Sequence, residues 1–483
     1  MQLRIVQQIL GLLLMLFSTT MLPPVFISAW YHDGSAAAFV SGFLVTLLTG
    51  LAVWAPVRRE SRDLRSRDGF LVVAGFWTLL GVFGGAPLLF ADQPAMSVTD
   101  AVFEAVSGLT TTGATVLTGL DRLPPAILYY RAQLHWLGGM GVVVLAVAVL
   151  PMLGVGGFQL YRAETPGAVK DTKLTPRITE TAKALWYVYL GLTVACTLAY
   201  WVAGMPLFDA VCHSFATLAT GGFSTHDASL AYFQSPLIDS IAVVFMVLAG
   251  TNFALHFLVW QSRSLRNYLH DPEFRAYLVI LAAISAFVIA YLYLSGYYSS
   301  LQEAGLQGVF HVVSIMTSTG FGRDDFSAWP GALPVLLVFS MFIGGCGGST
   351  SGGMKVMRWL LLYRQGAREV VRLVHPAAEI PVRLGETVVP QRVVDAVWGF
   401  FAIYVVLFGA MMLILLATGV DQVTAFSAIA TCLNNVGPGL GAISSNFAGM
   451  KDPDKWVCVL AMLLGRLEIF TLFVLISPAF WRR

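Results

Sequence analysis

The sequence predicts an all-α polytopic membrane protein, with four helix–pore loop–helix repeats around a central pore and two additional N-terminal transmembrane helices. Three observations lead to this prediction: the composition, a short motif that occurs four times, and the distribution of basic residues. Hydrophobic residues make up 57% of the chain and charged residues 12%, a balance far from that of a soluble domain. The 483 residues leave room for roughly ten crossings of about 20 residues each.

The repeated motif is a short apolar run that ends at a glycine. Its copies occupy 109–113 (LTTTG), 218–222 (LATGG), 316–320 (MTSTG) and 433–437 (LNNVG). In every copy the residue two positions before the glycine is small and carries a hydroxyl or an amide. The run before it amounts to about one to three helical turns, too short to cross a hydrocarbon core of roughly 30 Å. An internal repeat of this kind takes precedence over local assignments.

Long apolar segments flank each copy of the motif. The first two predicted helices, at about 5–28 and 36–57, precede the first copy. Around the four copies we expect pairs of full helices at about 70–91 and 125–151, 184–203 and 237–261, 275–295 and 331–361, and 393–418 and 456–479. The predicted units are 1–67 (two N-terminal helices), 68–175 (repeat 1), 176–270 (repeat 2), 271–385 (repeat 3) and 386–483 (repeat 4).

Basic residues indicate the orientation of these helices. The stretch 58–67 holds five arginines, and most other lysines and arginines lie in loops on the same predicted side. Such loops stay in the cytoplasm. Both termini are therefore predicted to be cytoplasmic, and the four glycine loops to lie in the outer half of the membrane. Five cysteines without CxxC spacing indicate buried free thiols.

The backbone of the repeated motif is suited to binding a cation. Non-helical backbone at membrane depth is tolerated only where it is buried in protein or lines a cavity. A half-helix that stops there directs the negative end of its dipole at the membrane interior. Glycine allows backbone conformations in which the preceding carbonyls replace the water shell of an ion. The absence of a carboxylate in the motif favours a monovalent cation over Mg²⁺ or Ca²⁺.

With these motifs the chain resembles the TrkH branch of the TrkH/KtrB/HKT superfamily of potassium transporters. The most specific matches are 110–114 (TTTGA), 219–226 (ATGGFSTH), 317–322 (TSTGFG) and 434–439 (NNVGPG). The resemblance implies a K⁺ selectivity filter made of Thr110, Thr111, Thr112, Gly113, Thr220, Gly221, Gly222, Ser318, Thr319, Gly320, Asn435, Val436 and Gly437. The implied K⁺ ligands are the backbone carbonyls of Thr111, Thr112, Thr220, Gly221, Ser318, Thr319, Asn435 and Val436. Either Gly221 or Gly222 could be the hinge of the second copy; Phe223, parallel to Phe321, favours Gly222.

A second feature is the glycine-rich run 344–353 (GGCGGSTSGG) inside the second helix of repeat 3. Six glycines in ten residues disfavour a helix by about 1 kcal/mol each relative to alanine. The break must then line a cavity, or allow close packing of neighbouring helices. The resemblance implies an intramembrane gate below the filter, made of Gly344, Gly345, Gly347, Gly348, Ser349, Thr350, Ser351, Gly352, Gly353 and Arg466.

Arg466 is a cation well inside an apolar helix. A charge in such a position is costly and usually faces a partner or a water-filled cavity. Snorkelling to the inner surface is the alternative, although at least ten apolar residues follow Arg466. The resemblance implies that this arginine faces the pore at the gate and sets a barrier to cations. His213 and His311, each nine residues before a filter glycine, are expected to be structural partners of the pore helices.

The function implied by the resemblance is a potassium uptake pore in the bacterial inner membrane rather than an enzyme. It has no tightly bound cofactor, and K⁺ is the transported substrate. The implied partners are a TrkA-type cytoplasmic ring that binds NAD and ATP, a second copy of the chain in a homodimer, and membrane lipid, but no nucleic acid. The alternatives are an H⁺- or Na⁺-coupled K⁺ symporter of the same architecture and, more remotely, an intramembrane enzyme. The sequence leaves open the K⁺ over Na⁺ ratio, the coupling, the gating ligand and the oligomeric state.

Overall fold

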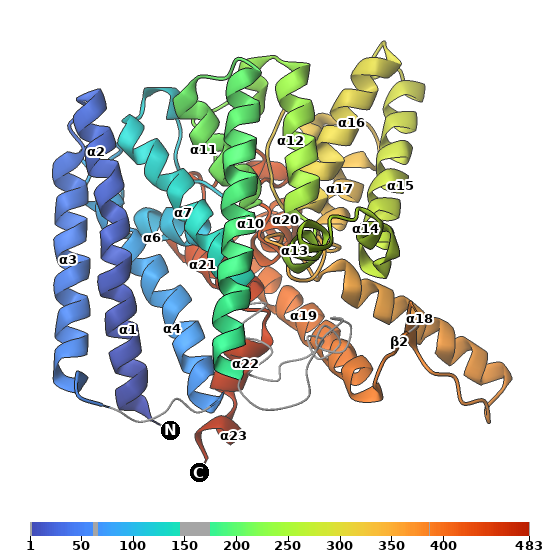
Figure 1. The fold of residues 1–483 in the computed structure, drawn as a ribbon. Coiled ribbons are helices and arrows are strands. Elements are labelled where there is room, and N and C mark those ends of the chain that lie inside the picture. The colour runs from blue at the N-terminus through green and yellow to red at the C-terminus, as the bar shows by residue number, and fades with distance from the viewer. Residues whose placement is uncertain (1, 61–65, 145–173, 386, 483) are drawn as a thin grey trace.

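A computed structural model describes residues 2–60, 66–144, 174–385 and 387–482 and consists almost entirely of helices (Figure 1). The N-terminal part is a helical hairpin. Its first arm is a single span made of α1 (Leu3–Ser18) and α2 (Leu22–Tyr31), and its second arm is α3 (Ala36–Trp54). The hairpin stands at one edge of the molecule in Figure 1. Asp33 fixes the turn of the hairpin, since its carboxylate accepts hydrogen bonds from Ser35 N (2.9 Å) and, across the chain, from Ala126 N (2.9 Å).

Four helical units follow, each with a short helix between longer ones. The first contains α4 (Ser66–Gly84), α5 (Ala86–Leu89), α6 (Val98–Leu109) and α7 (Pro125–Val144). The second contains α10 (Leu174–Val202), α11 (Leu207–Leu218), α12 (Pro236–Ala249), α13 (Phe253–Ser262) and α14 (Arg266–His270). The third contains α15 (Pro272–Leu294), α16 (Leu301–Met316), α17 (Leu333–Met341) and α18 (Val356–Val374), followed by a small hairpin of β1 (Arg383–Leu384) and β2 (Thr387–Val388). The fourth contains α19 (Gln391–Ala417), α20 (Gln422–Asn434), α21 (Asp452–Arg466), α22 (Phe470–Ile476) and α23 (Pro478–Trp481).

Six helices in the described residues are long and apolar enough to cross a membrane. They are Leu3–Tyr31, Ala36–Val57, Arg67–Leu89, Ala182–Val202, Pro272–Leu294 and Gln391–Ala417. The pair α12 and α13 counts as a seventh only if a bend of 94° is accepted within one span. The prediction of roughly ten full crossings, with a break only in repeat 3, is therefore too simple. Every first helix of a repeat spans continuously, whereas the second helices of repeats 2, 3 and 4 are interrupted.

The interruptions correct two helix predictions and agree with a third. The continuous helix predicted at 237–261 is wrong, because α12 ends at Ala249 and α13 begins anew at Phe253. Asn252 caps α13 by accepting a hydrogen bond from Ala254 N (2.8 Å). The continuous helix predicted at 456–479 is also wrong: Glu468 and Ile469 adopt positive φ of 52° and 54° between α21 and α22. The break expected in repeat 3 separates α17 from α18. The predicted end of the helix at 125–151 lies beyond Val144, outside the described residues.

The apolar core is divided into two large clusters. One joins the N-terminal hairpin to repeats 1 and 4, and the other joins repeats 2 and 3. Between them lie the ends of the four short helices, where buried hydroxyls and amides are concentrated. All five cysteines are free and buried, as predicted. The fold thus brings the polar ends of four apolar repeats to its centre.

Candidate functional site

The four short helices α6, α11, α16 and α20 all end in the same turn. The residue two before the glycine adopts the left-handed conformation in every copy: φ is 51° at Thr111, 50° at Thr220, 57° at Ser318 and 54° at Asn435. The next N–H bonds back to the carbonyl five residues earlier: Thr112 to Ser107 (2.9 Å), Gly221 to Ala216 (2.8 Å), Thr319 to Ser314 (2.8 Å) and Val436 to Thr431 (3.0 Å). This is the Schellman ending of a helix. Non-glycine residues in this conformation store strain, which is typical of functional sites.

The glycine that follows also has a positive φ in each copy. The values are 80° at Gly113, 81° at Gly222, 76° at Gly320 and 103° at Gly437. Gly221 does not share this conformation, so Gly222 is the hinge of the second copy. The choice that Phe223 favoured in the sequence agrees with the backbone.

The four glycines pack in a closed ring. A Cβ on Gly113 would overlap the carbonyl oxygen of Gly221, one on Gly222 that of Thr319, and one on Gly320 that of Val436. A Cβ on Gly437 would lie 2.8 Å from the carbonyl oxygen of Thr112 and so closes the circle. Each repeat thus contacts the next, and the fourth contacts the first. The predicted filter segments are brought together around one axis, with four of the eight predicted carbonyl ligands in the ring.

The amides of the fourth copy serve as braces. The Asn435 side chain donates from Nδ2 to Thr112 Oγ1 (2.9 Å) and to the Met462 carbonyl (3.0 Å), which joins repeat 4 to repeat 1. Asn434 accepts at Oδ1 from the Tyr404 hydroxyl (2.8 Å) on α19. The hydroxyls of Thr110 and Thr112 lie 2.8 Å apart and brace the first copy in a similar way. The two amides of the fourth copy therefore have structural roles.

A buried ion pair supports the ring from behind. Arg131 on α7 donates from Nε to Glu104 on α6 (2.7 Å), and both side chains are at most 1% exposed. Glu104 also accepts from Val116 N (3.0 Å) in the chain that leaves the first filter copy. Arg131 reaches repeat 2 by donating to the Ser224 carbonyl (3.2 Å), and its guanidinium carbon lies 4.1 Å from the centre of the Phe223 ring. Sequence reasoning missed Arg131, although a cation inside the predicted apolar helix at 125–151 is the same kind of signal that singled out Arg466.

Histidines take the place of Glu104 in the next two repeats. His213 contacts Ser224 Oγ through Nε2 (3.0 Å), and His311 contacts the Asp324 carbonyl in the same way (3.0 Å). Both therefore fasten the chain that leaves the filter to the short helix before it. This geometry agrees with the expected structural role.

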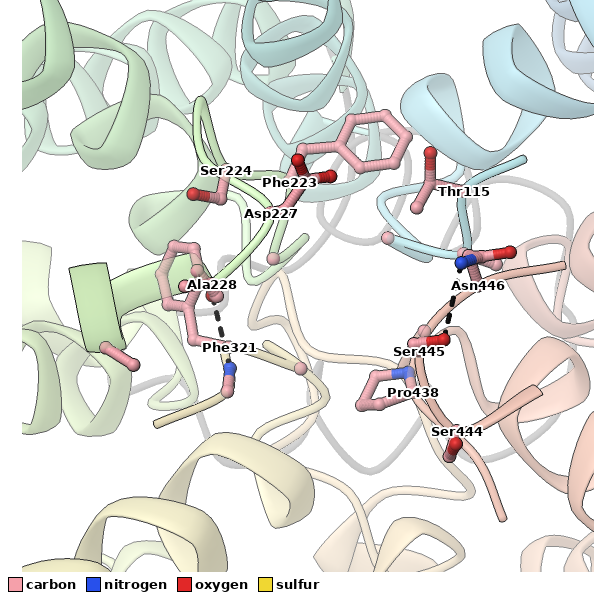
Figure 2. A pocket seen from close by; sticks show the side chains of 18 of the residues that line it. Thr115, Phe223, Ser224, Asp227, Ala228, Phe321, Pro438, Ser444, Ser445 and Asn446 are labelled. Carbon is pink, nitrogen blue, oxygen red and sulfur yellow. Dashed lines mark hydrogen bonds between the residues drawn. The ribbon is translucent and has the colours of Figure 1, made fainter. Parts of the chain in front are cut away.

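A cavity of about 410 Å³ lies on one side of the ring. The four ring glycines and the residues after them line it, together with Arg131. Figure 2 shows Thr115 of repeat 1, Phe223 and Asp227 of repeat 2, Phe321 of repeat 3 and Pro438 of repeat 4 around this hollow. Beyond them, His226 pairs with Asp121 and stacks on Tyr232 with ring centres 3.5 Å apart. The cavity gives the ring an open mouth that both polar and apolar side chains line.

The glycine-rich run crosses the opposite side of the ring. Gly352 N donates to Ser318 Oγ (2.5 Å), and Gly353 N donates to the Asn434 carbonyl (3.0 Å). A Cβ on Gly352 would overlap that same carbonyl oxygen. The run therefore lies in direct contact with the third and fourth filter copies. Of the two explanations offered by the sequence, these contacts support close packing, because the small residues allow this approach.

Arg466 reaches this run from α21. Its side chain is buried, with 4% exposed, and Nη1 donates to the Thr350 carbonyl (2.9 Å). Its guanidinium carbon lies 5.8 Å from the centre of the Trp77 ring, while Nε and Nη2 have no protein partner within the described chain. The snorkelling alternative is therefore wrong. The predicted gate residues 344–353 and Arg466 are brought together.

Three residues that anchor this region were missed by sequence reasoning. Glu273 on α15 accepts a hydrogen bond from Gly347 N (2.7 Å). Arg358, in the first turn of α18, pairs with Glu468, which lies at the break after α21. Glu273 follows Pro272 at a helix start, which is an ordinary place for an acidic residue and hence gave no signal.

Comparisons with known proteins agree with this geometry. A family profile described as "TrkH: Cation transport protein" matches residues 35–483. A Trk system potassium uptake protein TrkH from Vibrio parahaemolyticus is 56% identical over 486 residues, with 100% of both chains covered. The protein of the same name from Escherichia coli K12 is 52% identical over 482 residues, again with 100% of both chains covered. The crystal structure of the potassium transporter TrkH from Vibrio parahaemolyticus matches with a TM-score of 0.93 and 53% identity over 100% of both chains.

Proposed function

The chain belongs to the TrkH family of cation transport proteins, and on this premise we propose that it is a potassium uptake pore of the bacterial inner membrane. The observation that carries the proposal is the closed ring of four glycine loops, in which each glycine meets a carbonyl oxygen of the next repeat. K⁺ is the transported substrate in this proposal. The relatives are named as potassium uptake proteins, which supports that choice of ion.

K⁺ is proposed to pass through the ring with its water replaced by backbone carbonyls. The ligands are the carbonyls of Thr111, Thr112, Thr220, Gly221, Ser318, Thr319, Asn435 and Val436, held by the shared helix-ending turn. Four helix C-termini direct their partial negative charge at this point, which favours a cation. No carboxylate belongs to the ring-forming segments, so a dehydrated monovalent ion fits better than a divalent one.

The run 344–353 with Arg466 is proposed to be the gate. Its contacts with Ser318 and Asn434, next to the proposed filter, support this proposal. The buried guanidinium beside Thr350 adds a positive charge on the path of a cation. At an effective dielectric constant of about 20, two like charges 4 Å apart repel by about 4 kcal/mol, which would slow the passage of a cation about a thousandfold. Opening then means moving the run away from the ring and giving the arginine access to water.

A cytoplasmic regulator is proposed to move the gate. The name "Trk system" carried by the relatives implies further components, and a TrkA-type ring that binds NAD and ATP is the proposed one. α18 begins directly after the gate run and extends away from the bundle, on the end of the molecule where both termini lie (Figure 1). Its exposed Arg364 and Arg372 suit an acidic partner or anionic lipid. Both termini are proposed to be cytoplasmic, and the working form is proposed to be a homodimer.

A coupled symporter of the same architecture is the second candidate. Coupling to protons would need a titratable side chain at the ring, and the ring-forming segments contain only threonine, serine, asparagine, valine and glycine next to the axis. An intramembrane enzyme is a remote alternative. The relatives are named as transporters, which favours transport over catalysis.

Ion flux into liposomes that hold the purified protein tests the proposal. K⁺, Na⁺ and a pH gradient are varied separately, with protein-free liposomes as the control. We expect K⁺ to enter down its own gradient without Na⁺ or a proton gradient. Flux that requires either of them would favour the symporter. Absence of K⁺ flux, both alone and with the proposed regulator, would contradict the pore.

A further inference from the structure

The glycine-rich run is held on the side away from the ring by a single carboxylate. Glu273 lies in the first turn of α15 and is 2% exposed. Its Oε1 accepts from Gly347 N (2.7 Å), inside the run, and from Met357 N (3.1 Å), in the first turn of α18. One oxygen therefore links both Gly347, inside the run, and Met357, at the start of α18, to the first helix of repeat 3.

The first turn of α18 needs such a partner. The N–H groups of a first helical turn have no acceptor within the helix. The residue before this helix, Lys355, provides no side-chain cap. A carboxylate at this place also lies favourably against the positive end of the helix dipole. Glu273 thus caps α18 from another helix, and its own burial requires the hydrogen bonds that Gly347 and Met357 supply.

The same limb of the run is attached to the bend in repeat 2. Cys346 N donates to the Gly250 carbonyl (2.8 Å), and Phe253 N donates to the Gly348 carbonyl (3.2 Å). Both repeat-2 residues flank the break between α12 and α13, which bends by 94°. The run therefore cannot leave the ring without breaking bonds to α15 and to this bend. Among these partners in the described part of the chain, only Glu273 accepts hydrogen bonds from two N–H groups with its side chain.

We propose that Glu273 is a positioning residue that latches the run 344–353 in the position across the axis. The inference rests on the proposed gate function of the run. One oxygen accepts both hydrogen bonds, so its removal breaks both of them at once. Loss of the acceptor breaks the bonds of Gly347 and Met357 to α15, while the bonds to the repeat-2 bend and the ring contacts of Gly352 and Gly353 stay in place.

The run contains its own reporter, because Cys346 is buried with 1% exposed and lies next to Gly347. The other four cysteines, Cys196, Cys212, Cys432 and Cys458, are replaced by alanine in the full chain. The measurement is the rate at which a charged methanethiosulfonate reagent modifies Cys346 in reconstituted protein. Glu273→Ala should raise this rate at least about tenfold, since each tenfold step needs only about 1.4 kcal/mol.

Glu273→Gln is the matched control. Its amide oxygen occupies the place of the carboxylate oxygen and still accepts from Gly347 N and Met357 N, so the rate should stay within about threefold of the parent protein. An unchanged rate in Glu273→Ala overturns the latch, and so does an equal rise in both variants. If thermal unfolding shows that Glu273→Ala does not fold, Glu273→Asp replaces it. The shorter aspartate side chain does not reach the two N–H donors. An unchanged modification rate in Glu273→Asp would also overturn the latch. The modification rate needs no ion flux, so failure of the pore proposal in liposomes is distinguishable from failure of the latch.

Discussion

Replacing Gly113 by alanine tests the ring through one methyl group. Gly113 has a φ of 80°, and a Cβ at this position would overlap the carbonyl oxygen of Gly221. The left-handed conformation costs a residue with a Cβ about 1–2 kcal/mol. The overlap involves backbone rather than a flexible side chain, so the second filter copy must move. Overpacking of this kind costs about 1–3 kcal/mol more.

Gly119→Ala is the matched control for this substitution. Gly119 follows the same filter copy and has a φ of 69°, yet a Cβ there would meet nothing within 4 Å. It should therefore show the conformational cost alone. We expect Gly113→Ala to be less stable than Gly119→Ala by about 1–3 kcal/mol in thermal or denaturant unfolding.

Ion selectivity separates the two variants further. Gly113→Ala displaces the Gly221 carbonyl, one of the proposed K⁺ ligands, and should reduce the K⁺ over Na⁺ flux ratio at least about tenfold, which corresponds to about 1.4 kcal/mol. Gly119→Ala should keep the ratio of the parent protein. Equal selectivity in Gly113→Ala and Gly119→Ala, with both folded, would refute the assignment of this carbonyl to the filter.

Three further predictions follow from the contacts around the ring. Arg466→Ala removes the buried cation beside Thr350 and should raise K⁺ flux in the absence of a regulator. Arg466→Lys should raise the flux less. Lower flux in folded Arg466→Ala would contradict the proposed barrier. Arg131→Met leaves Glu104 buried without its partner and should lower the free energy of unfolding by about 3–5 kcal/mol. Arg131→Met combined with Glu104→Met should lower it clearly less. Equal decreases in the single and the double variant would contradict a paired role. The hydrogen bond from His226 holds the pKa of Asp121 below its ordinary value, so its stabilising effect is present above about pH 4 and is lost as the pH falls through the lowered pKa. The difference in melting temperature between the parent protein and Asp121→Asn should thus be present at pH 5 and shrink below pH 4, and a difference that grows on acidification would contradict it.

The sequence was informative wherever a local pattern repeats. The position two before each ring glycine carries a small polar side chain because the left-handed turn is there, and Phe223 pointed to the correct hinge at Gly222. The break at 344–353 was visible because glycine disfavours helix through its own backbone. These features depend on few neighbouring residues, so a single sequence contains them.

The remaining features depend on contacts between distant segments. The bend at Gly250 and Asn252 has no proline and lies in an otherwise apolar stretch, and the glycine-rich run of repeat 3 is hydrogen-bonded to the residues around it. The pair Arg131–Glu104 and the contact of Glu273 with the glycine-rich run likewise join distant segments, and the local sequence does not identify the partner. Helix breaks in such places are compensated by partners elsewhere in the chain, and hydropathy alone does not reveal them.

Direct observation of an ion in the ring tests the central claim. Crystals of the full protein grown with Rb⁺ or Tl⁺ in place of K⁺ would give an anomalous signal at each bound ion. We expect a peak on the axis among the carbonyl oxygens of Thr112, Gly221, Thr319 and Val436. An empty ring in well-ordered crystals at saturating ion, with peaks only elsewhere, would contradict the account.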